Sequence, residues 1–274
     1  MPESTADRQA GPGGTDEIVL TRSGEIATLW LNRPHKRNAL TYEMWVAIAT
    51  TCAELRRDAR LRVLVVRGAE GHFCAGADIG ELGAREPSGP GDFEAATRAV
   101  DDALATFPRP TIAHISGSCA GGGAQIAVAC DVRIADATAR ISIPPARLGI
   151  VYPEFALERL VRLVGPSAAK LLLYSAEAID AERALRIGLV DEVHEPAAAS
   201  QRVTTLAELI AGERSLLTQL ASKEMVDSVS ETGSVDPSIA SRWAAEVAAS
   251  TDAREGRAAF FERRTPRFDW RPPA

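Results

Sequence analysis

Two glycine-rich segments, each placed after a short apolar run, constrain this chain more than any other feature of its sequence. They are HFCAGADI at residues 72–79 and ISGSCAGGGAQ at residues 115–125. Glycine allows positive φ angles and lets a ligand come close to backbone N–H groups. Two such turns that converge on one oxygen atom form an oxyanion hole, a pair of fixed donors directed at developing negative charge. This chemistry suits an acyl thioester that reacts through an enolate.

The apolar pattern around these turns predicts a mainly parallel sheet with crossover helices. Short apolar runs predict strands over residues 17–22, 24–32, 61–68, 111–115 and 131–136. Helical periodicity predicts helices over residues 42–57, 93–107 and 121–130. The first of these helices follows Thr41, which is expected to cap it. Strand, turn, helix and strand recur with short connections, which is typical of an α/β fold.

From about residue 155 onward the pattern becomes helical. The C-terminal helices carry more apolar positions than solitary helices need, so they are expected to pack on another surface, such as a neighbouring subunit. At the other end, residues 1–15 are polar and rich in glycine and proline. They are predicted to form a disordered tail.

Charge and cysteine content narrow the possible partners. The chain of 274 residues has a net charge of −6 with no basic block, which argues against nucleic acid or an anionic membrane as its main partner. No apolar stretch approaches the length of a membrane-spanning helix.

The four cysteines include no CxxC pair, so no metal site or disulfide framework is expected and the cytoplasm is the better fit. Cys74 and Cys119 flank the glycine turns, and we interpret them as small buried residues rather than nucleophiles.

The glycine segments do not fit the common nucleotide-binding motifs. No lysine follows them as a P-loop requires, and Gly117, Gly121, Gly122 and Gly123 do not keep the GxGxxG spacing. A glycine turn that opens a helix favours an anion at the helix N-terminus.

Four segments of the chain resemble the crotonase family, the enoyl-CoA hydratase/isomerase superfamily. They are NRPHKRNAL at 32–40, HFCAGADI, the run from SGSCAGGGAQIAVACDVRIAD to PARLGI, and the terminal EGRAAFFERRTPRF. Their order and spacing match that family across nearly all of residues 16–270. The resemblance implies an α/β spiral of β-β-α repeats over residues 16–205. It also implies a helical oligomerisation region over 206–274, in a homotrimer or a dimer of trimers.

The same resemblance implies roles for individual residues. Ala77 and Gly122 would supply the two N–H groups of the oxyanion hole, and the substrate would be an acyl-CoA, with no separate cofactor and no metal. The residues expected to line the thioester are Asp78, Ile79 and Gly80. Those expected to hold CoA are Lys36, Arg37, Asn38 and Ala39, together with Phe260 and Arg263 lent by a neighbouring subunit. Arg33, Lys36, Arg37 and Arg263 supply the basic groups that the CoA phosphates need.

The chain departs from the hydratases of this family at the residues that handle protons. Addition of water to a double bond needs one group to activate the water and one to deliver a proton. Hydratases that resemble this chain use two glutamates, and the matching positions here are Gln125 and Pro145. Glutamine can orient water but cannot accept its proton, and proline offers neither function. Hydration by the glutamate pair is therefore not expected, and Gln125 is assigned to substrate binding.

Two residues of LGIVYPEFAL at 148–157 are alternative candidates. Glu154 lies near the position of the single catalytic glutamate in Δ3,Δ2-enoyl-CoA isomerases, and in an apolar pocket its pKa would rise toward neutrality. Tyr152 ends PPARLGIVY, which is similar to a segment of methylmalonyl-CoA decarboxylases whose tyrosine contacts the departing carboxylate. Decarboxylation needs an oriented carboxylate and a stabilised enolate but no base. A third hypothesis is a non-catalytic, trimeric acyl-CoA-binding scaffold.

Overall fold

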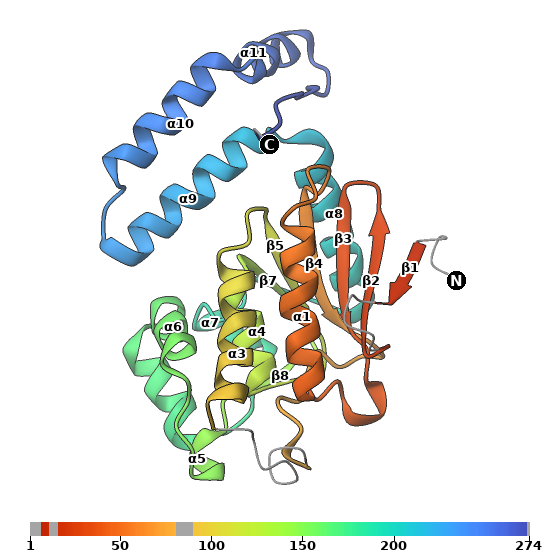
Figure 1. Cartoon of the computed structure of the whole chain (residues 1–274), viewed down its shortest axis with the longest axis vertical. Coiled ribbons are helices and arrows are strands. Elements are labelled where there is room, and N and C mark those ends of the chain that lie inside the picture. The colour runs from red at the N-terminus through yellow and green to blue at the C-terminus, as the bar shows by residue number, and fades with distance from the viewer. Residues whose placement is uncertain (1–6, 11–15, 81–89, 273–274) are drawn as a thin grey trace.

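A seven-stranded sheet forms the centre of the computed structural model, which describes residues 7–10, 16–80 and 90–272 (Figure 1). Its strand order is β1-β2-β3-β4-β5-β7-β10. The strands are β1 (Asp7–Ala10), β2 (Ile18–Ser23), β3 (Ile26–Leu31), β4 (Val63–Gly68), β5 (Thr111–Ile115), β7 (Val132–Asp136) and β10 (Glu192–His194). The pairs β1–β2 and β2–β3 are antiparallel, and every later pair is parallel. The prediction of a mainly parallel sheet is confirmed.

A second, three-stranded sheet includes part of the glycine-rich segment at 115–125. It pairs β6 (Ser118–Ala120) in parallel with β8 (Arg140–Ser142), which pairs antiparallel with β9 (Ile179–Asp180). Sequence analysis did not predict β6, because a strand of three small residues between glycines has too little apolar pattern to be recognised. The pairing of β6 with β8 nevertheless holds the backbone directly before the turn at Gly121 and Gly122.

The two faces of the main sheet are covered by different helices (Figure 1). On one face lie α1 (Tyr42–Leu55), α3 (Pro90–Ala105), α4 (Gly122–Ala129) and α6 (Glu154–Ser175), which contribute to the largest buried cluster. On the other face α8 (Pro196–Glu213) packs Val203, Ala207 and Ala211 against Val63, Val65 and other strand residues. Successive strand residues point to opposite faces, so Leu64 and Val66 face the first cluster while Val63 and Val65 face α8.

Helix α8 runs through residues 205 and 206, where the sequence suggested a boundary between core and oligomerisation region. Its buried side chains Val203, Ala207 and Ala211 pack against the main sheet on both sides of that boundary. The division itself stays a prediction. The helices beyond it, α9 (Leu216–Thr232), α10 (Pro237–Ala249) and α11 (Asp252–Glu262), extend away from the sheet (Figure 1). They have a small core of their own around Leu217, Ala221 and Trp243.

The remaining helical elements are short. They are η1 (Pro34–Lys36), α5 (Pro145–Leu148) and α7 (Ala181–Arg186). Helix α6 is interrupted at Gly165, whose φ of 74° and ψ of 166° are not helical. Within the described residues, no helix is both long enough and apolar enough to cross a membrane.

The N-terminal segment differs from the predicted disordered tail. Residues Asp7–Ala10 form β1, which pairs with β2 from Asp7 opposite Arg22 to Ala10 opposite Val19. Polar composition disfavours a core but does not prevent backbone pairing with an open sheet edge. Residues 1–6 and 11–15 lie outside the described part of the chain.

Helix α1 begins where the sequence predicted, and its cap can be tested. The Thr41 hydroxyl accepts a hydrogen bond from the Met44 N–H at 3.2 Å. Replacement Thr41→Ala leaves that N–H unpaired, and we expect the free energy of unfolding to fall by about 1 kcal/mol in chemical denaturation. Thr50→Ala is the matched control, because the Thr50 hydroxyl donates only to the Val46 carbonyl of the same helix. Equal losses in the two variants would contradict the capping role.

Candidate active site

The first glycine turn is held by backbone pairing with the segment before α1. Leu40 forms a parallel bridge with Ala77: the Leu40 N–H donates to the Gly76 carbonyl at 2.7 Å, and the Asp78 N–H donates to the Leu40 carbonyl at 2.8 Å. Such a bridge uses the polar groups on either side of Ala77 and leaves the N–H of Ala77 itself directed away from Leu40.

The second turn brings the N-terminus of α4 to the same place. A second parallel bridge, between Cys74 and Cys119, ties the two glycine segments together. A Cβ atom placed on Gly122 would lie 3.6 Å from the Ala77 nitrogen. As the first residue of a helix, Gly122 has no intrahelical acceptor for its N–H. Among the described residues, neither the Ala77 nor the Gly122 N–H donates to any acceptor.

Glycine is required at both turns because the backbones approach so closely. Gly76 has a φ of 99°, and a Cβ there would lie 2.9 Å from the Ala120 carbonyl oxygen. A Cβ on Gly122 would lie 2.7 Å from Cζ2 of Trp45. The Ala77 and Gly122 N–H groups thus meet where the backbones are close, an arrangement suited to binding an anion. Their role as an oxyanion hole stays a prediction.

This hole opens into a cavity of about 440 Å³. The walls are mainly apolar and include Trp45, Phe93, Leu148, Ile150 and Val151. Trp45 and Phe93 meet edge to face with ring centroids 6.4 Å apart. An apolar wall excludes water and strengthens any interaction between the donors and an oxyanion. The cavity therefore suits an apolar acyl group whose carbonyl reaches the hole.

Gln125 and Pro145 both line this cavity. Gln125 is buried, and its side-chain amide donates to the Thr97 carbonyl on α3 at 3.0 Å. Pro145 is the first residue of α5 and has no polar side chain. Among the described residues of the cavity wall, the carboxyl groups are those of Glu94 and Glu154.

Glu154 lines the cavity, but its environment differs from the apolar pocket that the sequence suggested. Its side chain is 65% exposed and is paired with Arg98. The backbone N–H at the start of α6, followed by Arg98, lowers the pKa of this carboxyl. The expected rise of the Glu154 pKa toward neutrality is therefore wrong. A carboxylate stabilised in this way is a weaker base than a lone buried glutamate.

Tyr152 differs from Glu154 because its side chain is buried and its polar group is not paired with another described residue. It lines the cavity wall and is 8% exposed, and its hydroxyl has no hydrogen-bond partner among the described residues. Burial raises the pKa of this phenol, so it remains protonated. Buried tyrosine hydroxyls usually find a partner, so an unpartnered one beside a cavity is a candidate ligand contact.

Asp101 is a feature that sequence reasoning missed. It follows Thr97 by one turn on α3, is fully buried, and accepts a hydrogen bond from Arg159 Nε at 2.8 Å through Oδ2. Its Oδ1 has no partner among the described residues. The sequence contained a signal for this buried acid: Asp101 lies between Val100 and Leu104, which are on the buried stripe of the same helix. An acidic residue on such a stripe is seldom buried without a reason.

The segment expected to hold CoA lies directly beside the hole. Its Arg37 carbonyl accepts the Ala75 N–H at 2.9 Å. Lys36 and Arg37 are exposed and Ala39 is half-buried, so all three are accessible from the solvent side. Asn38 is fully buried: its amide donates to the Ala69 and His72 carbonyls, and its oxygen accepts from the Arg33 N–H. The Asn38 side chain thus holds the loop together and is not available to CoA.

The three residues expected along the thioester separate into two groups. Ile79 lines the cavity and is 63% exposed. Asp78 and Gly80 do not line it, since Asp78 pairs with Arg33 at 2.6 Å and accepts the Gly80 N–H at 2.9 Å. The Arg33 hydrogen bond is the main reason that the pKa of Asp78 is lowered. This ion pair fastens the loop that carries Ala77.

Phe260 and Arg263 do not reach the cavity of their own chain. Phe260 lies on α11 and is 79% exposed, and Arg263 ends that helix. Neither residue lines the cavity, and Figure 1 shows α11 at the opposite end of the molecule from α5. Their role in CoA binding therefore stays a prediction.

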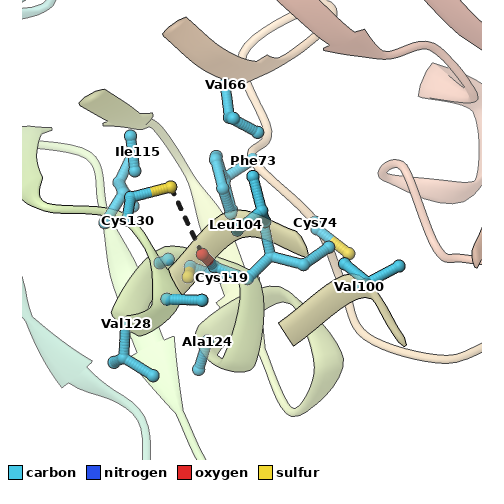
Figure 2. Close-up of a cluster of buried hydrophobic side chains, with 14 of the residues drawn as sticks. Val66, Phe73, Cys74, Val100, Leu104, Ile115, Cys119, Ala124, Val128 and Cys130 are labelled. Atoms are coloured by element: carbon cyan, nitrogen blue, oxygen red, sulfur yellow. Dashed lines mark hydrogen bonds between the residues drawn. The ribbon is translucent and has the colours of Figure 1, made fainter. Parts of the chain in front are cut away.

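The cysteines beside the turns are part of the core. Figure 2 shows Cys74, Cys119 and Cys130 among apolar side chains, and Cys130 contacts the Ile126 carbonyl at 3.4 Å. Burial raises the pKa of the Cys74 thiol to about 12 and that of Cys119 as well. Nucleophilic cysteines need a thiolate, so the interpretation of these residues as core is confirmed.

Comparison with known proteins gives the same picture. The family model described as enoyl-CoA hydratase/isomerase matches residues 21–271. This chain belongs to the enoyl-CoA hydratase/isomerase family. It is 32% identical to a crotonyl-CoA hydratase of Syntrophomonas wolfei over 92% of this chain and 98% of that one. It is also 31% identical to the human mitochondrial methylglutaconyl-CoA hydratase, over 98% of this chain and 89% of that one.

Solved structures of the family have the same fold. An enoyl-CoA hydratase/carnithine racemase from Magnetospirillum magneticum superposes with a TM-score of 0.87 at 30% identity, covering 93% of this chain and 96% of that one. A further structure of an enoyl-CoA hydratase/isomerase family member gives a TM-score of 0.86 at 34% identity, covering 93% and 97%. The crotonase fold with its C-terminal helices is thereby confirmed, and an acyl-CoA substrate is implied.

The oxyanion hole predicts the effect of a single methyl group. In Gly122→Ala the new Cβ meets Trp45 and reduces the space beside the Ala77 N–H. We expect acyl-CoA turnover to fall about a hundred- to a thousand-fold, because relief of the clash with Trp45 moves the residue 122 N–H out of line and so has the effect of losing one oxyanion donor. Steady-state kinetics measure this, and Gly212→Ala is the matched control, since its Cβ would meet no atom within 4 Å. An unchanged rate in Gly122→Ala would argue against the hole.

Proposed function

We propose that this chain decarboxylates an acyl-CoA that carries a second carboxylate on its α-carbon, a malonyl-type thioester. The observation that carries the proposal is the Tyr152 hydroxyl, which has no partner in the described part of the chain. It lies beside a cavity that ends at the Ala77 and Gly122 N–H groups, which likewise have no acceptor there. Gln125 and Pro145 stand where the family resemblance places the two hydratase glutamates. Decarboxylation is a reaction that does not need that pair.

The proposed step uses the hole to stabilise charge. The bond between the α-carbon and the carboxylate breaks, CO2 leaves, and the electron pair forms an enolate with the thioester carbonyl. The negative charge develops on the thioester oxygen, where the Ala77 and Gly122 N–H groups bind it. The α-carbon then takes a proton from a water molecule, which leaves as hydroxide, to give the shorter acyl-CoA. Tyr152, which stays protonated, orients the carboxylate through a hydrogen bond before it leaves.

Isomerisation of a 3-enoyl-CoA is the second candidate, because Glu154 also lines the cavity. Proton transfer between C2 and C4 needs a carboxylate basic enough to remove a proton from carbon. The ion pair with Arg98 and the lowered pKa of Glu154 weaken it for that task. We therefore rank isomerisation below decarboxylation, and hydration below both.

A substrate panel with matched variants tests this ranking. We expect CO2 release from malonyl-CoA, and we expect Tyr152→Phe to slow it about 10- to 100-fold, because a hydrogen bond to a charged group contributes about 1.5–3 kcal/mol. Tyr174→Phe is the control, since Tyr174 is 76% exposed. Coupled assays of CO2 and of the acyl-CoA product measure both rates.

Each alternative gives a different result on the same panel. Isomerisation of a 3-enoyl-CoA that is abolished by Glu154→Gln would replace decarboxylation by the isomerase hypothesis. Rapid hydration of crotonyl-CoA would overturn the low rank of hydration. Tight acyl-CoA binding without turnover of any of these substrates would support the non-catalytic scaffold.

We also propose that CoA lies along Lys36, Arg37 and the Ala39 backbone, and that the active unit is a homotrimer or a dimer of trimers. The support is the exposed basic pair beside the hole, and the distance of Phe260 and Arg263 from the cavity of their own chain. A neighbouring subunit would lend these two residues to the CoA site. Free, buried thiols at Cys52, Cys74, Cys119 and Cys130 support a reducing location such as the cytoplasm.

Two adjacent phenylalanines test the lent contact. Phe260 and Phe261 are each 79% exposed on α11, but the resemblance assigns CoA contact to Phe260 alone. We expect Phe260→Ala to weaken CoA binding about 10-fold, the effect of losing a buried aromatic contact of about 1.5 kcal/mol. Calorimetry measures the affinity, and light scattering of the same samples reports the oligomer. Equal weakening by Phe261→Ala would contradict the assignment.

A further inference from the structure

Cys74 is the residue at which the two glycine-rich segments meet. Its backbone N–H donates to the Ser118 carbonyl, and its own carbonyl accepts the Ala120 N–H, both at 2.9 Å. A Cβ atom placed on Gly123 would lie 2.8 Å from Cys74 Cβ and 2.5 Å from the Cys74 carbonyl oxygen. Cys74 therefore packs against the first turn of α4 and also belongs to the loop that carries Ala77.

The thiol of Cys74 contacts both backbone polar groups of Gly76. Its sulfur accepts the Gly76 N–H at 3.3 Å and lies 3.8 Å from the Gly76 carbonyl oxygen, to which the S–H can donate. Burial raises the pKa of this thiol to about 12, so the sulfur keeps the proton that the second contact needs. Gly76 is buried, and among the described residues its N–H has no other acceptor.

The conformation of Gly76 sets the direction of the Ala77 donor. The Gly76 carbonyl and the Ala77 N–H belong to one planar peptide unit, and the Leu40 N–H holds that unit through the carbonyl at 2.7 Å. The Cys74 sulfur holds the preceding peptide unit at the Gly76 N–H. The two units are joined only by rotations at Gly76, where φ is 99° and glycine permits a wide range of values. Without the thiol, Gly76 is held from one side only.

We propose that the Cys74 thiol is a positioning residue for the oxyanion hole: it fixes the Gly76 N–H and so keeps the Ala77 N–H directed at the substrate carbonyl. The inference rests on the hole that the proposed function uses. Cys74 does not line the acyl cavity, so it acts through the loop and not on the substrate itself. The buried sulfur thus has a task that requires a hydrogen-bonding group but no thiolate.

Three replacements at position 74 and one elsewhere test this role. Cys74→Ala removes the sulfur, whereas Cys74→Ser keeps a group that both accepts and donates. Replacement of Cys74 by α-aminobutyrate puts a methyl group in place of the thiol, which keeps the shape and tests the role even if Cys74→Ala does not fold. The matched control is Cys130→Ala, since Cys130 is also a buried thiol of the same core and its sulfur contacts only the Ile126 carbonyl.

The thioester carbonyl of bound acetyl-CoA reports the hole directly and needs no turnover. Donors at the carbonyl oxygen polarise the C=O bond and lower its stretching frequency, which infrared difference spectra of 13C-carbonyl acetyl-CoA measure. We expect the frequency to move back toward that of the free ligand in Cys74→Ala and in the α-aminobutyrate variant. Cys74→Ser and Cys130→Ala should match the wild type.

Steady-state kinetics with malonyl-CoA give a second readout. We expect Cys74→Ala to lower kcat about 10-fold with KM changed by less than about 2-fold, because a misdirected donor costs most in the transition state. Cys74→Ser should recover most of the lost rate. A wild-type carbonyl frequency in both Cys74→Ala and the α-aminobutyrate variant would overturn the inference. So would a shift of the same size in Cys130→Ala.

The same samples separate this inference from the proposed function. A carbonyl frequency that is lowered in a Cys74-dependent way, without CO2 release from malonyl-CoA, would refute decarboxylation and leave the role of Cys74 intact. CO2 release together with an unaltered carbonyl frequency in Cys74→Ala would refute the role of Cys74 alone. Wild type that does not lower the carbonyl frequency at all would refute the hole and, with it, this role.

Discussion

The close approach of two backbone segments, at Ala77 and at Gly122, is the constraint on which the rest of this site depends. Parallel bridges from Leu40 to Ala77 and from Cys74 to Cys119 hold the segments together, and they consume the neighbouring polar groups while leaving two N–H donors free. Preorganised donors of this kind need no rearrangement when charge develops, which is why they can stabilise an enolate strongly. A side chain at either turn would separate the segments.

The protein surrounds this fixed hole with an apolar wall and only a few polar groups. The wall raises the strength of every electrostatic interaction inside it, and it also raises the cost of leaving a polar atom unpaired. Glu154 avoids that cost by pairing with Arg98 at the exposed rim. The Tyr152 hydroxyl and one oxygen of Asp101 have no partner within the described ranges. The difference between rim and interior is therefore the physical reason that the pKa of Glu154 is lowered while that of Tyr152 is raised.

Sequence reasoning was most successful where local signals and burial agree. The Thr41 cap, the paired strands β2 and β3, and the buried strands β4 and β5 follow from residue types within a few positions of each other. It was less successful where the deciding contact is distant. The packing of α8 on the sheet joins residues on both sides of position 205, and β1 depends on an open edge at β2.

The sequence by itself determined the family, the two glycine turns and the absence of glutamates at 125 and 145, because each is a matter of residue type and spacing along the chain. Only the tertiary structure decided which side chains of the cavity are paired. Asn38 is committed to the loop, Glu154 is neutralised by a residue 56 positions away, and Asp101 is buried beneath the cavity wall. Partners, burial and pKa depend on atoms brought together by folding, and a linear pattern does not contain them.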